Sequence, residues 1–167
     1  MRPTVAASQT AYIGLGSNLE DPAVQIRKAI WRLERLPQCD VTAVSSNYRS
    51  EPLGPVAQPD FVNAVAALET RISGRELLQV LQRIEADMGR VRSGERWGPR
   101  LIDLDLLILG DTLIAEEDLV VPHPGIPERN FVLLPLREIA PDLIIPGLGP
   151  LADIAVDQRK PRIERIA

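Results

Sequence analysis

The sequence predicts an α+β fold of the ferredoxin-like type, a sandwich with a mostly antiparallel sheet and helices packed on its faces. Segments with strand character alternate with two amphipathic helical segments in the order β-α-β-β-α-β, which is typical of that fold. The 167 residues, 45% of them hydrophobic, also suit one domain with its own core. We therefore expect a single domain over residues 1–167, with its body at about 10–155 and short tails.

Four segments have the composition of strands. They are rich in β-branched or alternating apolar residues and are bounded by glycine, proline or polar turns. These segments are residues 11–15, 41–49, 61–70 and 101–109. The proline-rich residues 50–60 are expected to form a long loop, and Gly16-Ser17-Asn18 a tight structural turn after the first strand.

Three helices are expected. Asp21 and Pro22 have the residue types favoured at the N-cap and at the first helical position, and apolar residues at helical spacing extend this helix to Leu36. A second helix begins after Ser73, which starts a capping-box pattern. A short third helix is expected at 132–138.

Composition argues against several classes of protein. No stretch approaches the roughly 18 apolar residues that span a membrane, and the first ten residues lack the apolar centre of a secretory signal. The net charge of -4 disfavours general nucleic-acid binding. The single cysteine, Cys39, cannot form an internal disulfide and is expected to be inert. We therefore expect a cytoplasmic protein without a membrane or nucleic-acid partner.

Two aspartates on an otherwise apolar strand are the strongest local signal. Asp103 and Asp105 are two residues apart, so they share one face of the strand, while Leu104 and Leu106 point into a core. Two desolvated carboxylates cost free energy unless a cation neutralises them. Mg²⁺, which takes carboxylate and phosphate oxygens, is one such cation. A structural cluster with nearby arginines is the alternative.

A basic loop precedes this strand. Between residues 88 and 100 the sequence holds Arg90, Arg92, Arg96 and Arg100. Guanidinium groups bind phosphate oxygens in bidentate fashion, and carboxylates that bind a metal beside such a loop are the parts that phosphoryl transfer needs. The alternative is a solvated basic turn.

Aromatic side chains and the only histidine are weaker candidates. Trp97, in the arginine loop, could stack on a flat ring or cover the edge of the core. Phe61 and Asn63 share a strand face, which suits a flat heterocycle with hydrogen-bonding edges, although a core Phe beside a satisfied Asn is commoner. His123 could contact phosphate or be incidental.

The glycine-containing segment 14–19 matches no known phosphate loop. Leu19 stands where the dinucleotide fingerprint has its third glycine, and the Gly-Lys-Ser/Thr of a P-loop is missing. Any ATP would therefore be held by side chains.

Taken together, these segments resemble one family, the 6-hydroxymethyl-7,8-dihydropterin pyrophosphokinases of folate biosynthesis. The most specific match is Arg-Trp-Gly-Pro-Arg-Leu-Ile-Asp-Leu-Asp-Leu at residues 96–106. Supporting matches follow the family's order at residues 12–19, 48–55, 58–63, 82–92, 121–124 and 128–131. The resemblance covers about residues 10–155.

The resemblance implies transfer of pyrophosphate from ATP, the co-substrate, to the hydroxymethyl group of the pterin. The hydroxymethyl oxygen would attack the β-phosphorus and give AMP and the pterin diphosphate. Two Mg²⁺ ions would lie on Asp103 and Asp105, and Arg90, Arg92 and Arg100 would handle phosphate charge. We also expect a monomer whose product passes to dihydropteroate synthase.

The resemblance assigns further residues to each substrate. The residues implied for the pterin are Ser50, Glu51, Leu53, Phe61, Asn63, Trp97 and Phe131. The residues implied for ATP are Gln82, Glu85, Arg92, Trp97, Arg100, Leu106, His123 and Arg129. The pterin would stack between the two phenylalanines, and the loops that begin at residues 50 and 90 would close over the reactants.

The chain departs from the family pattern at three positions. Ser93, Gly125 and Pro127 stand where relatives often carry basic residues or histidine, and the basic tail 159–165 lies outside the resemblance. Two alternatives are another Mg²⁺-ATP transferase acting on a different small alcohol, and an RNA-binding module that uses sheet aromatics. The aromatic and amide set opposes the first alternative. The negative charge and the paired aspartates oppose the second.

Overall fold

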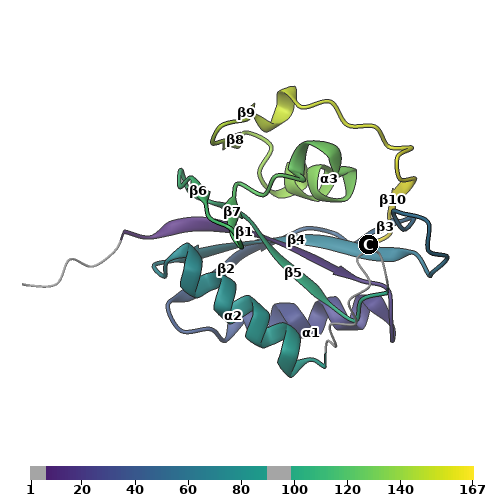
Figure 1. Cartoon of the computed structure of the whole chain (residues 1–167), viewed down its shortest axis with the longest axis horizontal. Coiled ribbons are helices and arrows are strands. Elements are labelled where there is room, and N and C mark those ends of the chain that lie inside the picture. Colours follow the sequence, from purple (N-terminus) through teal and green to yellow (C-terminus); the bar gives the residue numbers. More distant parts are fainter. Residues whose placement is uncertain (1–6, 90–98) are drawn as a thin grey trace, which may run out of the picture.

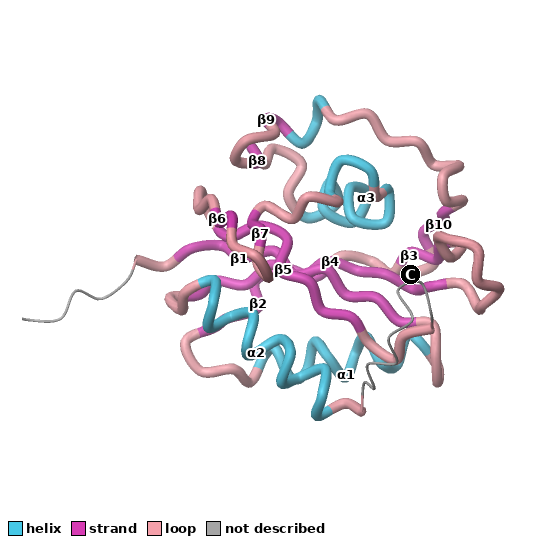
Figure 2. Tube along the Cα trace, in the orientation of Figure 1, coloured by secondary structure: helices cyan, strands magenta, loops and turns pink. Residues whose placement is uncertain are grey.

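The computed structural model describes residues 7–89 and 99–167. A central sheet separates helices α1 (Pro22–Glu34) and α2 (Gly74–Asp87), which cover one face, from α3 (Asn130–Ile139), which covers the other (Figures 1 and 2). The helices therefore lie on both faces of the sheet, as the sequence predicted.

The sheet is antiparallel at every pairing between described strands. Its strands run in the order β10-β3-β4-β1-β5, and β2 also pairs with β4. The strands are β1 (Gln9–Ser17), β2 (Cys39–Val44), β3 (Tyr48–Ser50), β4 (Phe61–Thr70), β5 (Asp103–Leu109) and β10 (Ile163–Arg165). The spatial order β5-β1-β4-β2 with α1 and α2 on one face is that of a ferredoxin-like sandwich, so the predicted fold class is confirmed.

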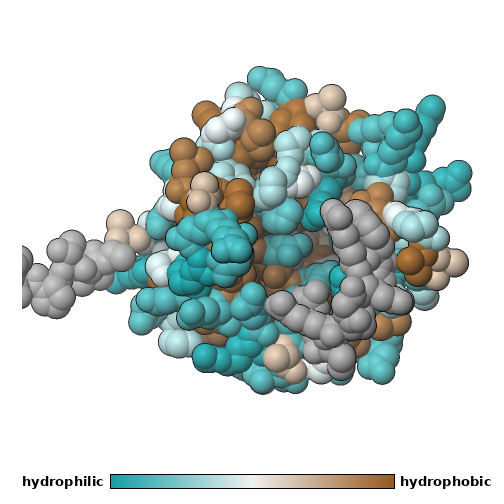
Figure 3. Space-filling model, viewed as in Figure 1, coloured by the Kyte–Doolittle hydropathy of each residue, from teal (hydrophilic) through white to brown (hydrophobic). Residues whose placement is uncertain are grey.

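Short elements extend this framework after β5. They are the hairpin β6 (Ile114–Ala115) and β7 (Val120–Val121), the 3₁₀ turn at Ile126–Glu128, the hairpin β8 (Ile144–Ile145) and β9 (Gly149–Pro150), and the 3₁₀ turn at Leu151–Asp153. Exposed apolar side chains gather around the two hairpins, including Leu113 and Ile144 (Figure 3).

Two cores stabilise the sheet from opposite sides. On the α1 and α2 side, Ile13 and Leu15 of β1 and Leu104 and Leu106 of β5 are buried against the two helices. On the α3 side a smaller cluster includes Leu107. Each buried Leu or Ile contributes roughly 1.5–3 kcal/mol relative to an exposed one. Asp103 and Asp105 share the opposite face of β5 from Leu104 and Leu106, as predicted, and in the structure this is the α3 face.

Helix α1 begins where predicted but ends earlier than predicted. Asp21 occupies the N-cap position, but its backbone is left-handed (φ 60°) and its side chain makes no capping hydrogen bond, while Pro22 starts the helix as expected. The helix ends at Glu34, short of Leu36. The Ser73 cap of α2 is confirmed, because its hydroxyl accepts a hydrogen bond from the Glu76 N–H at 3.2 Å.

Two strand predictions were wrong in detail. The predicted strand 41–49 is two strands, because β2 pairs with the C-terminal half of β4 and β3 with its N-terminal half. The predicted turn at residues 16–18 begins inside a strand, since β1 continues to Ser17 with Gly16 paired on both sides. Helix α3 is also longer than predicted and contains Pro135.

The C-terminal tail joins the sheet as β10. Its Ile163 lies opposite Ser50 of β3, and the buried Asn130 side chain donates to the carbonyls of Asp157 and Pro161 at 2.8 and 2.6 Å. The tail, for which the sequence offered no role, therefore covers the outer edge of β3.

A hydrogen-bonded group links α3 to β3 near this edge. The Tyr48 hydroxyl donates to Glu138 Oε1 at 2.7 Å, and the Ser46 N–H donates to Glu138 Oε2 at 2.8 Å. Burial, and then the Glu138 carboxylate, raise the pKa of Tyr48 to about 12. For Glu138, burial alone would raise the pKa, but the hydrogen bonds from Tyr48 and Ser46 and the charge of Arg165 outweigh it, so the pKa is lowered.

We predict that Glu138→Gln destabilises the protein at neutral pH and that this difference disappears in acid. A lowered pKa in the folded state means that the carboxylate contributes stability above its unfolded pKa of about 4.3 and loses it as the pH falls through the folded value. Urea unfolding of the two proteins from pH 7 to pH 3 measures this difference. An unfolding free-energy difference that does not change with pH would contradict the prediction.

Candidate active site

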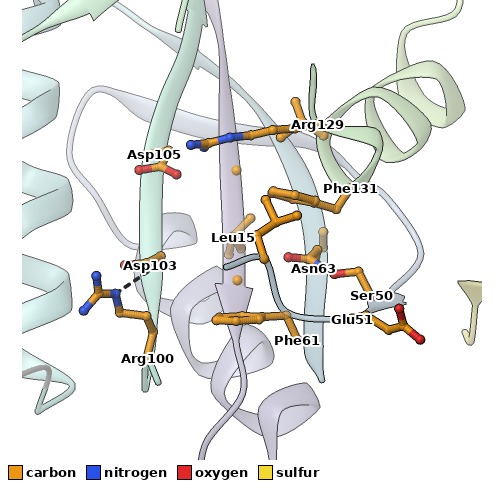
Figure 4. A pocket seen from close by; sticks show the side chains of 15 residues that line it. Leu15, Ser50, Glu51, Phe61, Asn63, Arg100, Asp103, Asp105, Arg129 and Phe131 are labelled. Atoms are coloured by element: carbon orange, nitrogen blue, oxygen red, sulfur yellow. Dashed lines mark hydrogen bonds and ion pairs between the residues drawn. The ribbon is translucent and has the colours of Figure 1, made fainter. Parts of the chain in front are cut away.

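A cavity opens on the α3 face, where β1, β4 and β5 lie side by side beneath the start of α3 (Figure 4). It is lined by Gly14, Leu15, Gly16, Ser50, Glu51, Leu53, Phe61, Asn63, Ala64, Arg100, Asp103, Asp105, Arg129, Phe131 and Val132. Ten of the residues that the sequence analysis proposed for the site are therefore brought together from distant parts of the chain.

The register of the three central strands sets the floor of this cavity. Gly16 of β1 lies opposite Asn63 on one side and Asp103 on the other, and Gly14 lies opposite Asp105. Residues opposite one another across a sheet share a face, so two positions without side chains lie between the amide and the carboxylates. A Cβ at Gly16 would stand 3.3 Å from Asn63 Oδ1. The sequence analysis missed these glycines; their spacing of two residues was the available signal.

Two aromatic rings form a slot at one end of the cavity. Phe61 of β4 and Phe131 of α3 are both seen edge-on in Figure 4, one ring above the other. The Asn63 amide lies at a height between the two rings in this view. The Asn63 NH₂ group donates to Ser50 Oγ at 2.8 Å and to the Tyr48 carbonyl at 3.3 Å. These bonds fix the amide so that its oxygen, an acceptor, faces the glycine floor. The slot thus offers two flat apolar surfaces and a fixed polar edge.

The carboxylates lie at the other end of the cavity. Asp103 Oδ2 is 3.8 Å from Arg100 Nε, an ion pair (Figure 4). The guanidinium of Arg129 points toward Asp105 in the same view, and it also lies over the Phe131 ring, 5.8 Å from its centre. Both carboxylates thus lie beside an arginine and line the cavity.

The donor set suits a hard cation shared with a ligand. Within residues 7–89 and 99–167, no group of three or more His, Cys, Asp or Glu side chains could hold a metal ion by itself. Mg²⁺ is commonly held by one or two carboxylates together with substrate phosphates and water. Asp103 and Asp105, which share one face, fit that mode.

Gly125, one of the departures from the family pattern, has a structural role beside Arg129. A Cβ at Gly125 would stand 2.7 Å from Arg129 Nε. Any larger residue at this position would therefore displace the arginine side chain that reaches into the cavity. The absence of a side chain at position 125 therefore leaves room for the Arg129 side chain.

His123 lines a separate groove and is outside the lining of the cavity. Its Nδ1 accepts a hydrogen bond from the Gly125 N–H at 2.9 Å, so Nδ1 carries no proton. Burial, followed by the positive charge of Arg129, lowers the pKa of His123. The imidazole is therefore neutral near pH 7, with its hydrogen on Nε2 available to donate.

Three residues proposed for ATP do not line the cavity either. Gln82 is exposed on α2. Leu106 is buried in the core on the opposite face. Glu85 is buried, and its Oε2 accepts a hydrogen bond from the Leu104 N–H at 3.0 Å. Their contacts with ATP stay predictions, and those of Arg90, Arg92 and Trp97 fall outside the described residues.

Comparison with known proteins shows the family of this chain. The model of the family described as 7,8-dihydro-6-hydroxymethylpterin-pyrophosphokinase (HPPK) matches residues 12–141. The chain belongs to this family. Two relatives named 2-amino-4-hydroxy-6-hydroxymethyldihydropteridine pyrophosphokinase, from Haemophilus influenzae and Pseudomonas aeruginosa, are 50% and 51% identical over 138 residues. Those residues are 83% of this chain and 86% and 85% of the relatives.

Solved structures of more distant HPPK chains share the fold. Plasmodium falciparum HPPK-DHPS, a triple mutant with STZ-DHP, superposes with a TM-score of 0.69 at 16% identity over 89% of this chain. The wild type with pterin and p-hydroxybenzoate gives a TM-score of 0.68 at 15% identity. The HPPK chain described here spans 43% of each of those solved chains.

We predict that Gly16→Val closes the floor of the cavity. The added side chain would enter the space beside Asn63, so the affinity for 6-hydroxymethyl-7,8-dihydropterin is expected to fall at least about tenfold, the equivalent of one lost hydrogen bond. The melting temperature should change by only a few degrees because valine favours strands. Calorimetric titration and thermal unfolding measure the two quantities. Unchanged pterin affinity in a folded variant would show that the glycine floor does not contact the ligand.

Proposed function

We propose that this HPPK transfers pyrophosphate from ATP to the hydroxymethyl group of 6-hydroxymethyl-7,8-dihydropterin, giving AMP and the pterin diphosphate, a step of folate biosynthesis. The observation that carries the proposal is a single cavity with an aromatic slot and fixed amide at one end and two carboxylates beside arginines at the other. Membership of the family supports the same reaction.

The slot is the proposed pterin site. Phe61 and Phe131 would stack on the two faces of the ring, and offset aromatic pairs contribute about 0.5–1.5 kcal/mol each beyond the area they bury. The fixed Asn63 oxygen would accept a hydrogen bond from the pterin edge, and Asn63 is one of the buried polar groups of the protein. Ser50, at the end of β3, and Glu51 and Leu53, in the loop that follows it, also line the cavity. Trp97 would cover the ring from the arginine loop.

The carboxylate end is the proposed phosphate site. Asp103 and Asp105 would hold Mg²⁺, with two ions proposed, and the bound cation would offset the negative charge of the phosphates. Arg100 and Arg129 enter the same space, and Arg90 and Arg92 would add positive charge from the loop. Guanidinium groups there would stabilise charge on the departing AMP.

Positioning accounts for most of the expected catalysis. The hydroxymethyl oxygen forms a bond to the β-phosphorus, the bond from that phosphorus to the oxygen of AMP breaks, and the hydroxyl proton passes to solvent water. This displacement requires the attacking and leaving oxygens to lie in line. Slot and carboxylates lie on one rigid sheet face, so a pterin in the slot would present its substituent toward phosphates held at Asp103 and Asp105.

The remaining proposed ATP contacts differ in kind. His123 Nε2–H would donate to phosphate as a neutral group. The Leu104 N–H faces α2 at the outer edge of β5, and strand alternation places the main-chain groups of Leu106 at that same edge. Leu106 would therefore contact ATP through its main chain. Glu85 would act by fixing the position of this strand edge through its hydrogen bond to the Leu104 N–H. Gln82 would contact ATP from the exposed side of α2.

The oligomeric state, the location and the next enzyme are also proposals. Among the described residues no helix is long and apolar enough to cross a membrane. We propose a single-domain monomer in the cytoplasm. We further propose that its product passes to dihydropteroate synthase, the activity named beside HPPK in the solved P. falciparum chains.

The nucleotide product tests the reaction. Purified protein incubated with ATP, Mg²⁺ and 6-hydroxymethyl-7,8-dihydropterin should form AMP, and no ADP, only when the pterin is present. Separation of the nucleotides by chromatography measures this. ADP as the product would mean transfer of a single phosphate to an alcohol. Pterin binding without any turnover would favour a binding module.

We predict that Asp105→Ala abolishes turnover and leaves the fold intact. The variant would lose a cation ligand at the phosphates, so kcat is expected to fall at least about 10³-fold, within the range that one electrostatic group supplies. Asp111→Ala, in the exposed turn after β5, is the matched control and should be unaffected. Near-normal turnover in Asp105→Ala would remove this carboxylate from the metal site.

A further inference from the structure

Asn18 is a buried side chain just beyond the end of β1 that binds two other segments of the chain. It is 2% exposed. Its NH₂ group donates to Gln58 Oε1 and to the Pro59 carbonyl, both at 2.9 Å. Its Oδ1 accepts from the Arg100 N–H at 2.8 Å, and its own N–H donates to the Arg100 carbonyl at 3.0 Å.

The two segments that Asn18 joins serve opposite ends of the cavity. One is the loop 51–60, which begins at the Ser50 end of β3 and runs directly into Phe61, a wall of the aromatic slot. The other is the backbone of Arg100, whose side chain pairs with Asp103 at the carboxylate end. The contacts of Asn18 thus connect the two proposed substrate sites.

The chemistry of these contacts requires a primary amide. Two acceptors, on Gln58 and Pro59, face the NH₂ group, and one donor, the Arg100 N–H, faces the oxygen. Aspartate would keep the acceptor but set a carboxylate against the Pro59 carbonyl. Leucine would lose both functions. A residue that only filled space at the end of β1 would not need this arrangement.

We propose that Asn18 is a positioning residue that holds the loop 51–60 and Arg100 in one arrangement, so that the pterin site and the phosphate site keep a fixed position relative to each other. The inference rests on the proposed function of the cavity. Asn18 is absent from the lining of the cavity. It would therefore act through the residues that it positions, the loop before Phe61 and the Arg100 backbone.

The test compares Asn18→Asp with the pair Gln58→Leu and Gln58→Glu. A glutamate at position 58 still accepts from the Asn18 NH₂ group, whereas leucine does not, so the pair separates the hydrogen bond from a general effect at this position. Kd for 6-hydroxymethyl-7,8-dihydropterin and for α,β-methylene-ATP with Mg²⁺ would be measured by calorimetry, alongside kcat, KM and the melting temperature.

We expect Asn18→Asp to weaken pterin binding about tenfold and to raise KM for pterin in parallel, because roughly one hydrogen bond to the loop is lost. Binding of the ATP analogue alone should stay within about twofold, since Oδ1 still accepts from Arg100. Gln58→Leu should weaken pterin binding about threefold, and Gln58→Glu should restore it.

Lower melting temperature with unchanged pterin Kd and KM in Asn18→Asp would overturn the proposal, because that result is purely structural. Equal pterin affinities for Gln58→Leu and Gln58→Glu would also overturn it, and this pair decides the question if Asn18→Asp does not fold. Absence of pterin binding by the unaltered protein would instead reject the proposed function.

Discussion

The register of β1 between β4 and β5 is the constraint on which the rest of the site depends. It sets Gly16 in line with Asn63 and Asp103. Because side chains alternate along a strand, a slip of one residue would turn both β5 carboxylates into the core and expose Leu104 and Leu106 instead. Desolvating the two carboxylates would cost several kcal/mol each. Burial of the leucines on one face therefore fixes the register that keeps the aspartates on the other face. Stability and the proposed chemistry use the same alternation.

The two faces of the sheet have different functions. The α1 and α2 face is filled by a large apolar core, which allows the α3 face to stay partly open over β1. Glycine in a strand interior costs roughly 0.5–1 kcal/mol relative to alanine. Gly14 and Gly16 carry that cost at the cavity floor, and the core beneath them offsets it. The tail strand β10 and Asn130 then support β3, whose Ser50 orients Asn63.

The sequence predicted the fold class, because that follows from alternation and from helix caps, and the resemblance to the family implied most of the residues that line the cavity. The sequence failed where tertiary pairing decides. Gly16-Ser17-Asn18 has the composition of a turn, and only the partners on both sides make Gly16 part of a strand. The division of residues 41–49 likewise follows from two segments sharing one edge of β4. Glu85, proposed for ATP, hydrogen-bonds a strand edge, which no periodicity reveals.

The departure from the family pattern at Gly125 is explained by its position beside Arg129. Read in sequence, Gly125 is a missing basic residue and suggests a weakened phosphate site. In the structure its missing side chain leaves the space in which the Arg129 side chain lies, and Arg129 supplies positive charge over Phe131 and toward Asp105. The Gly125 N–H also donates to His123 Nδ1, which fixes the tautomer of the imidazole. A basic side chain at position 125 would compete with Arg129 for this space.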